Sequence, residues 1–550
     1  MRERGSNGMR TRMSWNSKYL GACAALAGVA ALEGLYGCAG DDGVESFVEE
    51  NVGEISEAVG EDSDFTPSVC PTAPTCNSSI ATVVEPSLIV RRTITHAAML
   101  DANFSLSAVL QQLINQAGAT TETPTELYRR LWDTYASSST QFNEPYAPHC
   151  SASANGYPLD CPRPGDSTNA VTGLPGHFRP VALVNRFDLT PLDGSNCGEY
   201  RIVYWSNGSS NTGTIIFEAQ IPNPNPTCGV EACRPIADFW KSLAGLDEAT
   251  LGAKLQSFYF TGLPGFRPAI EVRNYGLGAT GSTYGASGGQ IRTNTISSAG
   301  PWQLREFHLG LNTSGVIKLF MQPVTVKNNP FGDLFNIASA NANASAFRAD
   351  FTLGTTTSQV TALAAPNLNN ISMNILNQYN SFQSTSQNSA PNNYLTSLPA
   401  GASNAFTAAI TADVPVSSSL TPNNIVDRAT TQSCAGCHLI SNDRPLGGGL
   451  TWPPSGADGS QFVHIGDSGG ISDALKCVFL PHRQRILSKF EQSCGTMPAA
   501  IIPSGCQSFG NLFAPQNPSS AQISSSAKSA RATASPSTPV GTLGGGSSVN

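Results

Sequence analysis

The stretches PVALVNRFDL (180–189), EYRIVYW (199–205) and TIIFEAQI (214–221) decide the fold class of this 550-residue chain. They are rich in β-branched and aromatic residues and are separated by Gly, Asn and Ser, which is typical of strands joined by turns. We expect further strands in AIEVRNYG (269–276), GQIRTNTI (289–296), WQLREFHLGL (302–311) and VIKLFMQPVTV (316–326). The sequence therefore predicts a β-rich body whose strands form an antiparallel sandwich or a barrel-like sheet.

Helical patterns lie on both sides of these strands. Apolar residues recur at helical spacing from Leu106 to Ile114 and end before Gly118, and a second helix should begin with Thr123 as its cap and Pro124 at its first position. We expect a helical insertion over 235–260 and short helices in the Ser/Asn/Ala-rich region that runs to about residue 413.

Charged residues occur inside the predicted strands, where solvent exposure is not guaranteed. They are Arg186, Asp188, Glu199, Arg201, Glu218, Arg305, Glu306 and His308. Because side chains alternate along a strand, Arg186 and Asp188 should share a side, as should Glu199 and Arg201. These residues either form a polar pocket that binds a ligand or faces a cofactor, or pair across strands on a solvated face. His96, His149 and His177 are isolated in the sequence, and we expect structural roles for them.

The N-terminal segment predicts export. Five basic residues precede an apolar run from Tyr19 to Leu32, which is too short for a membrane span and typical of a signal peptide. The sequence Leu35-Tyr36-Gly37-Cys38 resembles a bacterial lipobox, so we expect a signal peptide over 1–37 and a lipidated Cys38, with Cys23 or ordinary cleavage as alternatives. Met13 is an alternative start.

Net charge excludes one class of partner. The formal net charge is −8, but the first 69 positions hold five basic and twelve acidic residues, which leaves 26 basic and 27 acidic residues in the remainder. We therefore expect residues 38–69 to form an acidic tether to the membrane. The neutral body offers no basic field for nucleic acid.

Cysteine number agrees with an oxidising compartment. Setting aside two cysteines in the leader and two in a motif described below, ten of the fourteen cysteines remain, enough for five disulfides. The pairs 70/76, 150/161 and 228/233 are close enough to bridge locally, and Cys197 would then need a distant partner. We expect a periplasmic or cell-envelope protein, specifically an outer-membrane lipoprotein.

One motif in the chain specifies a chemistry. Residues 434–440 read CAGCHLI, and a short helix capped by Thr421 and Pro422 leads into it. Two cysteines at this spacing can reach the two vinyl groups of a haem, and the next residue, His438, can then bind the iron. A zinc site would need further Cys or His ligands at paired spacing, and no second CxxC follows. The chain also lacks the GxSxG, HExxH and phosphate-loop motifs.

Cys434, Cys437 and His438 resemble the attachment motif of mono-haem c-type cytochromes, over residues 421–506. The resemblance implies one covalent haem c, with His438 as its proximal ligand, in a small helical domain. His464, in the loop before the predicted helix 472–492, is the favoured distal ligand, because family topology places that ligand there. Met497, before Pro498, is the alternative, and a five-coordinate iron comes third. Trp452 and Phe462 would form the wall of the haem pocket. His482 is expected on the helix surface.

The predicted organisation follows from these segments. It comprises a signal peptide (1–37), an acidic tether (38–69), a β-rich body of one or two subdomains (70–413), a linker (414–424), a cytochrome c-like domain (425–510) and a disordered tail (511–550). The expected function is electron transfer with an unidentified redox partner. The alternatives are a haem-dependent oxidoreductase whose active site includes the body, and a non-redox binding or structural lipoprotein. Di-haem peroxidases carry two CxxCH motifs, and this chain carries one.

Overall fold

The computed structural model describes most of the chain between residues 85 and 492. The described ranges are 85–137, 144–163, 175–191, 194–206, 213–276, 289–296, 301–312, 316–353, 358–386, 390–398, 403–453, 465–472 and 474–492. All of them belong to one compact unit, Glu50–Asn550. Within these ranges, no helix is both long and apolar enough to cross a bilayer. The predicted signal peptide, acidic tether and tail lie outside the described residues.

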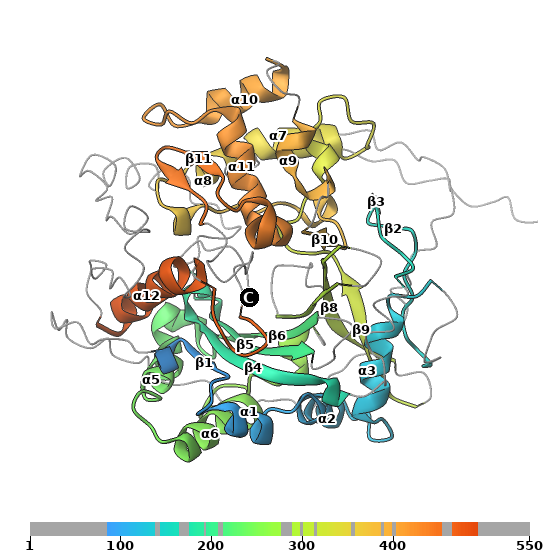
Figure 1. The fold of residues 1–550 in the computed structure, drawn as a ribbon, viewed down its shortest axis with the longest axis vertical. Helices are drawn as coiled ribbons and strands as arrows, with labels where there is room; N and C mark the ends of the chain where they lie inside the picture. Colours follow the sequence, from blue (N-terminus) through green and yellow to red (C-terminus); the bar gives the residue numbers. More distant parts are fainter. Residues whose placement is uncertain are drawn as a thin grey trace, which may run out of the picture. The chain divides into compact units, whose positions relative to one another are not determined.

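A single antiparallel sheet of eight strands organises the fold (Figure 1). Its strands are β1 (Ile89–Arg91), β4 (Phe178–Arg186), β5 (Asn196–Ser206), β6 (Gly213–Pro222), β7 (Gln290–Thr295), β8 (Gln303–Asn312), β9 (Lys318–Val324) and β10 (Ser384–Thr385). Strands β4 to β8 pair in chain order, β1 pairs with β4, and both β9 and β10 pair with β8. The antiparallel β-rich body is confirmed, and of the two expected arrangements the two-sheet sandwich is wrong, because the main strands form one sheet.

The two faces of the sheet differ in chemistry. Register aligns Ile202 with Phe217, Phe217 with Ile291, and Ile291 with Phe307, so one face is apolar. The neighbouring positions carry Arg201 opposite Glu218 on the other face. Because side chains alternate along a strand, a single strand register determines which residues lie on each of the two faces.

Helices from the first half of the chain cover the apolar face. They are α1 (Ala97–Asn103), α2 (Leu106–Gln116), α3 (Pro124–Asp133), α5 (Arg234–Lys241) and α6 (Glu248–Gln256). The side chain of Tyr200 on β5 stacks on Trp240 of α5, and the Tyr204 hydroxyl donates to the carbonyl of Phe104 at 2.9 Å. The predicted caps are confirmed: Thr123 and Glu126 form a capping box at α3, with Pro124 at its first position.

One predicted strand is wrong. Residues 269–276 contain a short 3₁₀-helix, Val272–Tyr275, where AIEVRNYG predicted a strand. The Glu271 side chain accepts a hydrogen bond from the backbone N–H of Arg273 at 3.0 Å, and Gly276 has a left-handed φ of 91°. Such local side-chain hydrogen bonds compete with strand pairing, which explains the helical turn.

A second group of helices lies on the opposite side of the sheet (Figure 1). It contains α7 (Ala344–Leu353), α8 (Gln359–Leu363), α9 (Tyr394–Ser397), α10 (Ala405–Asp413) and α11 (Pro422–Gln432), and the chain ends its described part with α12 (Leu480–Gln492). The buried Arg428 side chain of α11 donates to the carbonyls of Leu363 and Leu446, both at 2.8 Å. These bonds fasten α11 to α8 and to the small hairpin β11–β12 (Pro445–Gly447, Leu450–Thr451).

Two disulfides are resolved among the described cysteines. Cys150–Cys161 is the expected local bridge, but Cys197 pairs with Cys233, so the expected pair 228/233 is wrong. The bridge joins β5 to the start of α5, which sequence spacing does not reveal. Cys228 and Cys477 are also disulfide-bonded.

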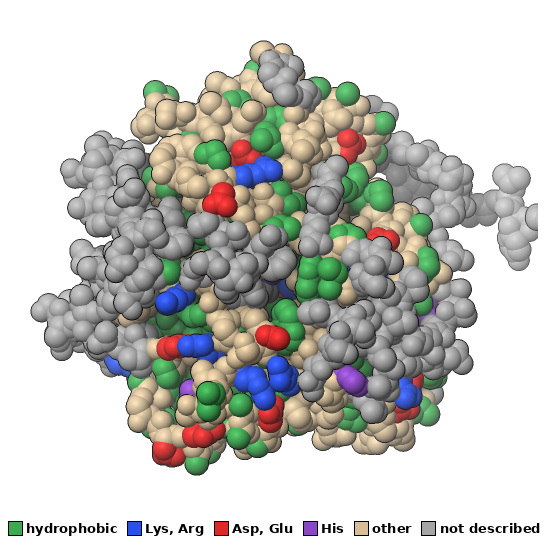
Figure 2. All heavy atoms as spheres, viewed as in Figure 1, with side chains coloured by type: hydrophobic (Ala, Val, Ile, Leu, Met, Phe, Trp, Pro, Cys, Tyr) green, Lys and Arg blue, Asp and Glu red, His purple; other side chains and the backbone are tan. Residues whose placement is uncertain are grey.

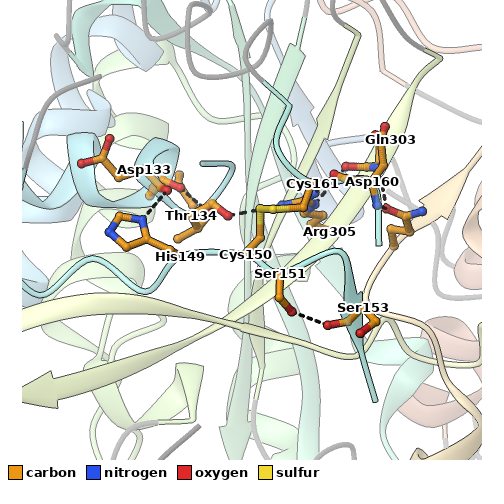
Figure 3. The surroundings of a disulfide bond; sticks show 12 residues. Asp133, Thr134, His149, Cys150, Ser151, Ser153, Asp160, Cys161, Gln303 and Arg305 are labelled. Carbon is orange, nitrogen blue, oxygen red and sulfur yellow. Dashed lines mark hydrogen bonds between the residues drawn. A yellow bond between two sulfur atoms is a disulfide. The ribbon is translucent and has the colours of Figure 1, made fainter. Parts of the chain in front are cut away.

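The Cys150–Cys161 bridge holds a loop beside β8 (Figure 3). There the Arg305 guanidinium donates to the carbonyl of Asp160 at 2.7 Å and lies 4.2 Å from the ring centre of Tyr135. His149 lies 3.3 Å from the carbonyl of Asp133. Arg305 is therefore part of this structural cluster and takes no part in the site described next.

Candidate functional site

The CAGCH motif begins where α11 ends. Thr421 and Asn424 form a capping box at the start of α11, with Pro422 at its first position, as the sequence predicted. Ser433 closes the helix with an extended φ/ψ, and its hydroxyl accepts a hydrogen bond from the N–H of Gly436 at 3.0 Å. Ser433 therefore ends one helix and caps the next turn, the geometry in which serine is favoured.

The motif itself is a helical turn of π type over Gly436–Ile440. A Cβ on Gly436 would lie 1.7 Å from the carbonyl oxygen of Thr430, so this position requires glycine. Cys434 and Cys437 stand three residues apart, a separation at which helical side chains are neighbours. Both are thiols and not disulfides.

The turn is buried against the polar face of the sheet. Cys434, Cys437 and His438 are each exposed to 3% or less. Cys434 packs with Leu304 of β8 and with Val326, and the N–H of Ala435 donates to the Ser384 hydroxyl of β10 at 2.9 Å. A motif some 130 residues beyond β8 in sequence is thus seated directly on that strand.

A network of buried charges lies beside Cys434. Arg201 pairs with Glu199 at 2.5 Å and with Glu218 at 3.2 Å. Arg292 pairs with Glu218 at 3.2 Å and with Glu306 at 2.6 Å. These five residues are exposed to 7% or less, so the alternative of ion pairs on a solvated face is wrong. The pairing was predicted, but its burial was not.

Burial sets the protonation of this region. It raises the pKa of Cys434 to about 12, with Arg292 opposing and Glu306 reinforcing the rise, so the thiol is neutral at pH 7. Burial likewise raises the pKa of Glu218, against the lowering effect of Arg201 and Arg292.

Helix α12 brings further groups to the same face. Arg483 lies 4.0 Å from the Asp188 carboxylate, which Arg186 already binds at 2.9 Å. The neighbouring His482 is 8% exposed, so its expected place on the helix surface is wrong. A π turn over Leu475–Phe479 leads directly into α12, whose second residue is Pro481.

The remaining predicted residues fall into two groups. His464, Met497, Phe462 and Cys38 lie outside the described residues, so both proposed distal ligands and the lipidation site stay predictions. Trp452 is buried and packs on Phe479 with ring centres 5.8 Å apart. Among the described His, Cys, Asp and Glu side chains, no group of three is arranged to hold a metal ion.

Sequence reasoning missed Arg292 and Arg483 as parts of the site. Arg292 could have been found, because it occupies the same alternating position in β7 as Glu306 does in β8. No sequence pattern could have linked Arg483 to the site, because Arg483 lies almost 300 residues after Asp188.

Comparison with protein-family models, with curated proteins and with solved structures found no match to this chain. The site must therefore be interpreted from its own chemistry.

Acid should destabilise the fold through two histidines, the buried His482 and the partly buried His308. Burial lowers the pKa of His482 and of His308 to about 4, below the usual value near 6.5. The unfolded chain then binds more protons between pH 6.5 and 4, so stability falls as pH drops through this window. Each histidine should cost up to roughly 3 kcal/mol by pH 4. Urea midpoints measured from pH 7.5 to 4 should show this slope, and it should flatten in His482→Gln; an unchanged slope would contradict the burial of His482.

Proposed function

We propose that this protein is an exported, lipid-anchored c-type cytochrome that carries one covalent haem and acts in electron transfer. The observation that carries the proposal is the CAGCH turn: two buried thiols three residues apart on one helical turn, followed by a buried histidine. Haem c bound in this way would supply a one-electron redox centre.

Three structural features support the proposal in addition to the motif. The thiols are not consumed in a disulfide, although other described cysteines are bridged. The requirement for glycine at 436 keeps the turn tight, and Ser433 fixes its start. Cys434 and Cys437 would hold the haem, and His438 would be its proximal ligand.

Export and anchoring are proposed on different grounds. The resolved disulfides support a compartment in which disulfides persist, as the periplasm does. We place the protein in the cell envelope, as an outer-membrane lipoprotein anchored through Cys38. His464 is the proposed distal ligand and Met497 its alternative; a far-red absorption band that disappears in Met497→Ala would select Met497.

The proposal is tested by the spectrum of the mature protein. Expressed with an intact haem-maturation system, the full-length protein should give a pyridine haemochrome of haem c at one haem per chain. The variant Cys434→Ser/Cys437→Ser should give none, while its far-ultraviolet circular dichroism remains that of the parent. A colourless parent would reject the cytochrome and leave a non-redox envelope lipoprotein.

One observation favours a second candidate, a haem-dependent oxidoreductase whose active site includes the sheet. The buried network of Glu199, Arg201, Glu218, Arg292 and Glu306 lies beside Cys434, where an electron carrier needs no such charges. The binding of carbon monoxide or cyanide distinguishes the electron carrier from the oxidoreductase. An electron carrier with two axial ligands should bind neither readily, whereas an enzyme with an open iron should bind both.

A further inference from the structure

Two buried arginines share one carboxylate at the edge of the polar face. Arg186 binds Asp188 through Nε at 3.0 Å and through Nη2 at 2.9 Å. Arg483 approaches the same carboxylate from α12, but its Nε is 4.0 Å away, beyond hydrogen-bond range. The three residues are exposed to 1%, 5% and 3% for Arg186, Arg483 and Asp188.

Three nitrogen atoms on the residues that neighbour this carboxylate have no hydrogen-bond partner within the described part of the chain. They are Nη1 of Arg186, Nη1 of Arg483 and Nε2 of His482, and each is buried. A buried donor without a partner costs about 1–3 kcal/mol, and more when it is charged. The two guanidinium nitrogens are certain donors, whereas Nε2 of a neutral His482 donates in only one tautomer. Two unpartnered buried donors on arginines that flank one carboxylate indicate a site suited to a further hydrogen-bond acceptor.

The charges of the site do not balance. Arg186 and Arg483 carry two positive charges against one negative charge on Asp188. The adjoining network is balanced, because Arg201, Arg292 and Lys327 face three glutamates, Glu199, Glu218 and Glu306. His482 does not supply the missing negative charge, and Arg485 on the same helix adds a positive one near it. Among the described residues one buried positive charge is left over, and burial strongly lowers the pKa of Arg483.

The unbalanced arginine lies beside the haem-attachment turn. The electrostatic neighbours of Arg483 include Cys437 as well as Arg186, Asp188 and Arg201. A haem joined to Cys437 would hold its two propionate groups across the porphyrin from the thioether bonds, so a propionate would meet arginines that lie about one ring width from the sulfur. A carboxylate is the acceptor that matches an arginine fork in both charge and geometry.

We infer that Arg186 and Arg483 form a buried carboxylate-binding site beside Cys437, which neutralises Arg483 when occupied. The identity of the carboxylate as a haem propionate rests on the proposed function. A small soluble carboxylate has the same chemistry and would use the same donors, so the experiment separates these two sources.

The first measurement uses the full-length variant Cys434→Ser/Cys437→Ser, which carries no covalent haem. In this background Arg483→Met should raise the urea midpoint or leave it unchanged, since it removes an uncompensated buried charge. Lys476→Met, which replaces an exposed lysine in the turn Leu475–Phe479 directly before α12, is the control and should change the midpoint little. A large loss of stability in Arg483→Met would mean that the chain itself compensates Arg483 and would overturn the inference.

The second measurement is calorimetric titration with sodium propionate. The haem-less variant should bind propionate, Arg483→Met should weaken binding at least tenfold, and Arg483→Lys should weaken it less because it keeps the charge. Binding that is absent, or equal in Arg483→Met, would overturn the inference.

Haem attachment then identifies the source. If a haem propionate is the natural ligand, the haem-loaded parent should no longer bind added propionate, and its reduction potential should shift in Arg483→Met. Undiminished binding to the loaded protein would assign the site to a soluble carboxylate. A parent that never acquires haem would reject the proposed function, while both measurements on the haem-less chain would still decide the carboxylate site.

Discussion

Replacing Arg130 by methionine is expected to lower the free energy of unfolding by about 3–5 kcal/mol, because it leaves a buried carboxylate without its cation. Arg130 of α3 binds the Glu122 carboxylate and the carbonyl of Leu319, and both charged side chains have no exposed surface. The second Glu122 oxygen accepts the N–H of Leu319 at 2.8 Å, so the pair fastens α3 to β9. Urea denaturation at pH 7.5 measures the loss.

The pH dependence and two further variants identify the cause. Burial raises the pKa of Glu122 and Arg130 opposes that rise, so in Arg130→Met the carboxyl should take up a proton more readily. The loss should therefore shrink as pH falls towards 5, and Glu122→Gln added to Arg130→Met should restore much of the stability. Asp101→Ala, which removes an exposed pair with Arg92 at 2.7 Å, should cost less than about 1 kcal/mol. Equal losses in the two single variants would contradict the burial argument.

Replacing Gly436 by alanine is expected to disrupt the turn that presents Cys434 and Cys437. The added Cβ would meet the backbone carbonyl of Thr430, and no rotamer change can relieve a contact with backbone. Overpacking of this kind costs about 1–3 kcal/mol, and we expect the upper end of that range. The haem content of the purified protein should fall with the stability, as measured by the pyridine haemochrome and by urea denaturation.

Gly176 provides the matched control for this substitution. A Cβ there would meet no atom within 4 Å, so Gly176→Ala should leave both haem content and the urea midpoint unchanged. Normal haem content in Gly436→Ala would show that the motif tolerates a looser turn than the one described.

Charged side chains on the face of the molecule that Figure 2 shows are interspersed in sign over the described residues. A further group of charges is internal, on the sheet beside Cys434. The described part of this face therefore shows no wide field of one sign that would steer a charged partner to it.

Local patterns in the sequence determined much of the fold. The β-branched stretches became β4 to β9, the Thr-Pro pairs began α3 and α11, and the apolar stripe from Leu106 became α2. These features depend on side-chain periodicity and on hydrogen bonds within four residues, so neighbouring letters suffice to predict them. Cys434, Cys437 and His438 belong to the same class, since their spacing is itself the motif.

Only the tertiary structure decided which groups meet and which are buried. Alternation placed Arg201 and Glu199 on one side of a strand, but whether that side is covered depends on the later segments of α11 and α12 packing back onto the sheet. The same packing brings Arg483 to Asp188 and buries His482. On the other face, the packing of α5 beside β5 pairs Cys197 with Cys233. The physical reason is that burial and charge pairing between distant segments are properties of the folded chain, whereas helix caps and strand alternation are already present in short pieces of it.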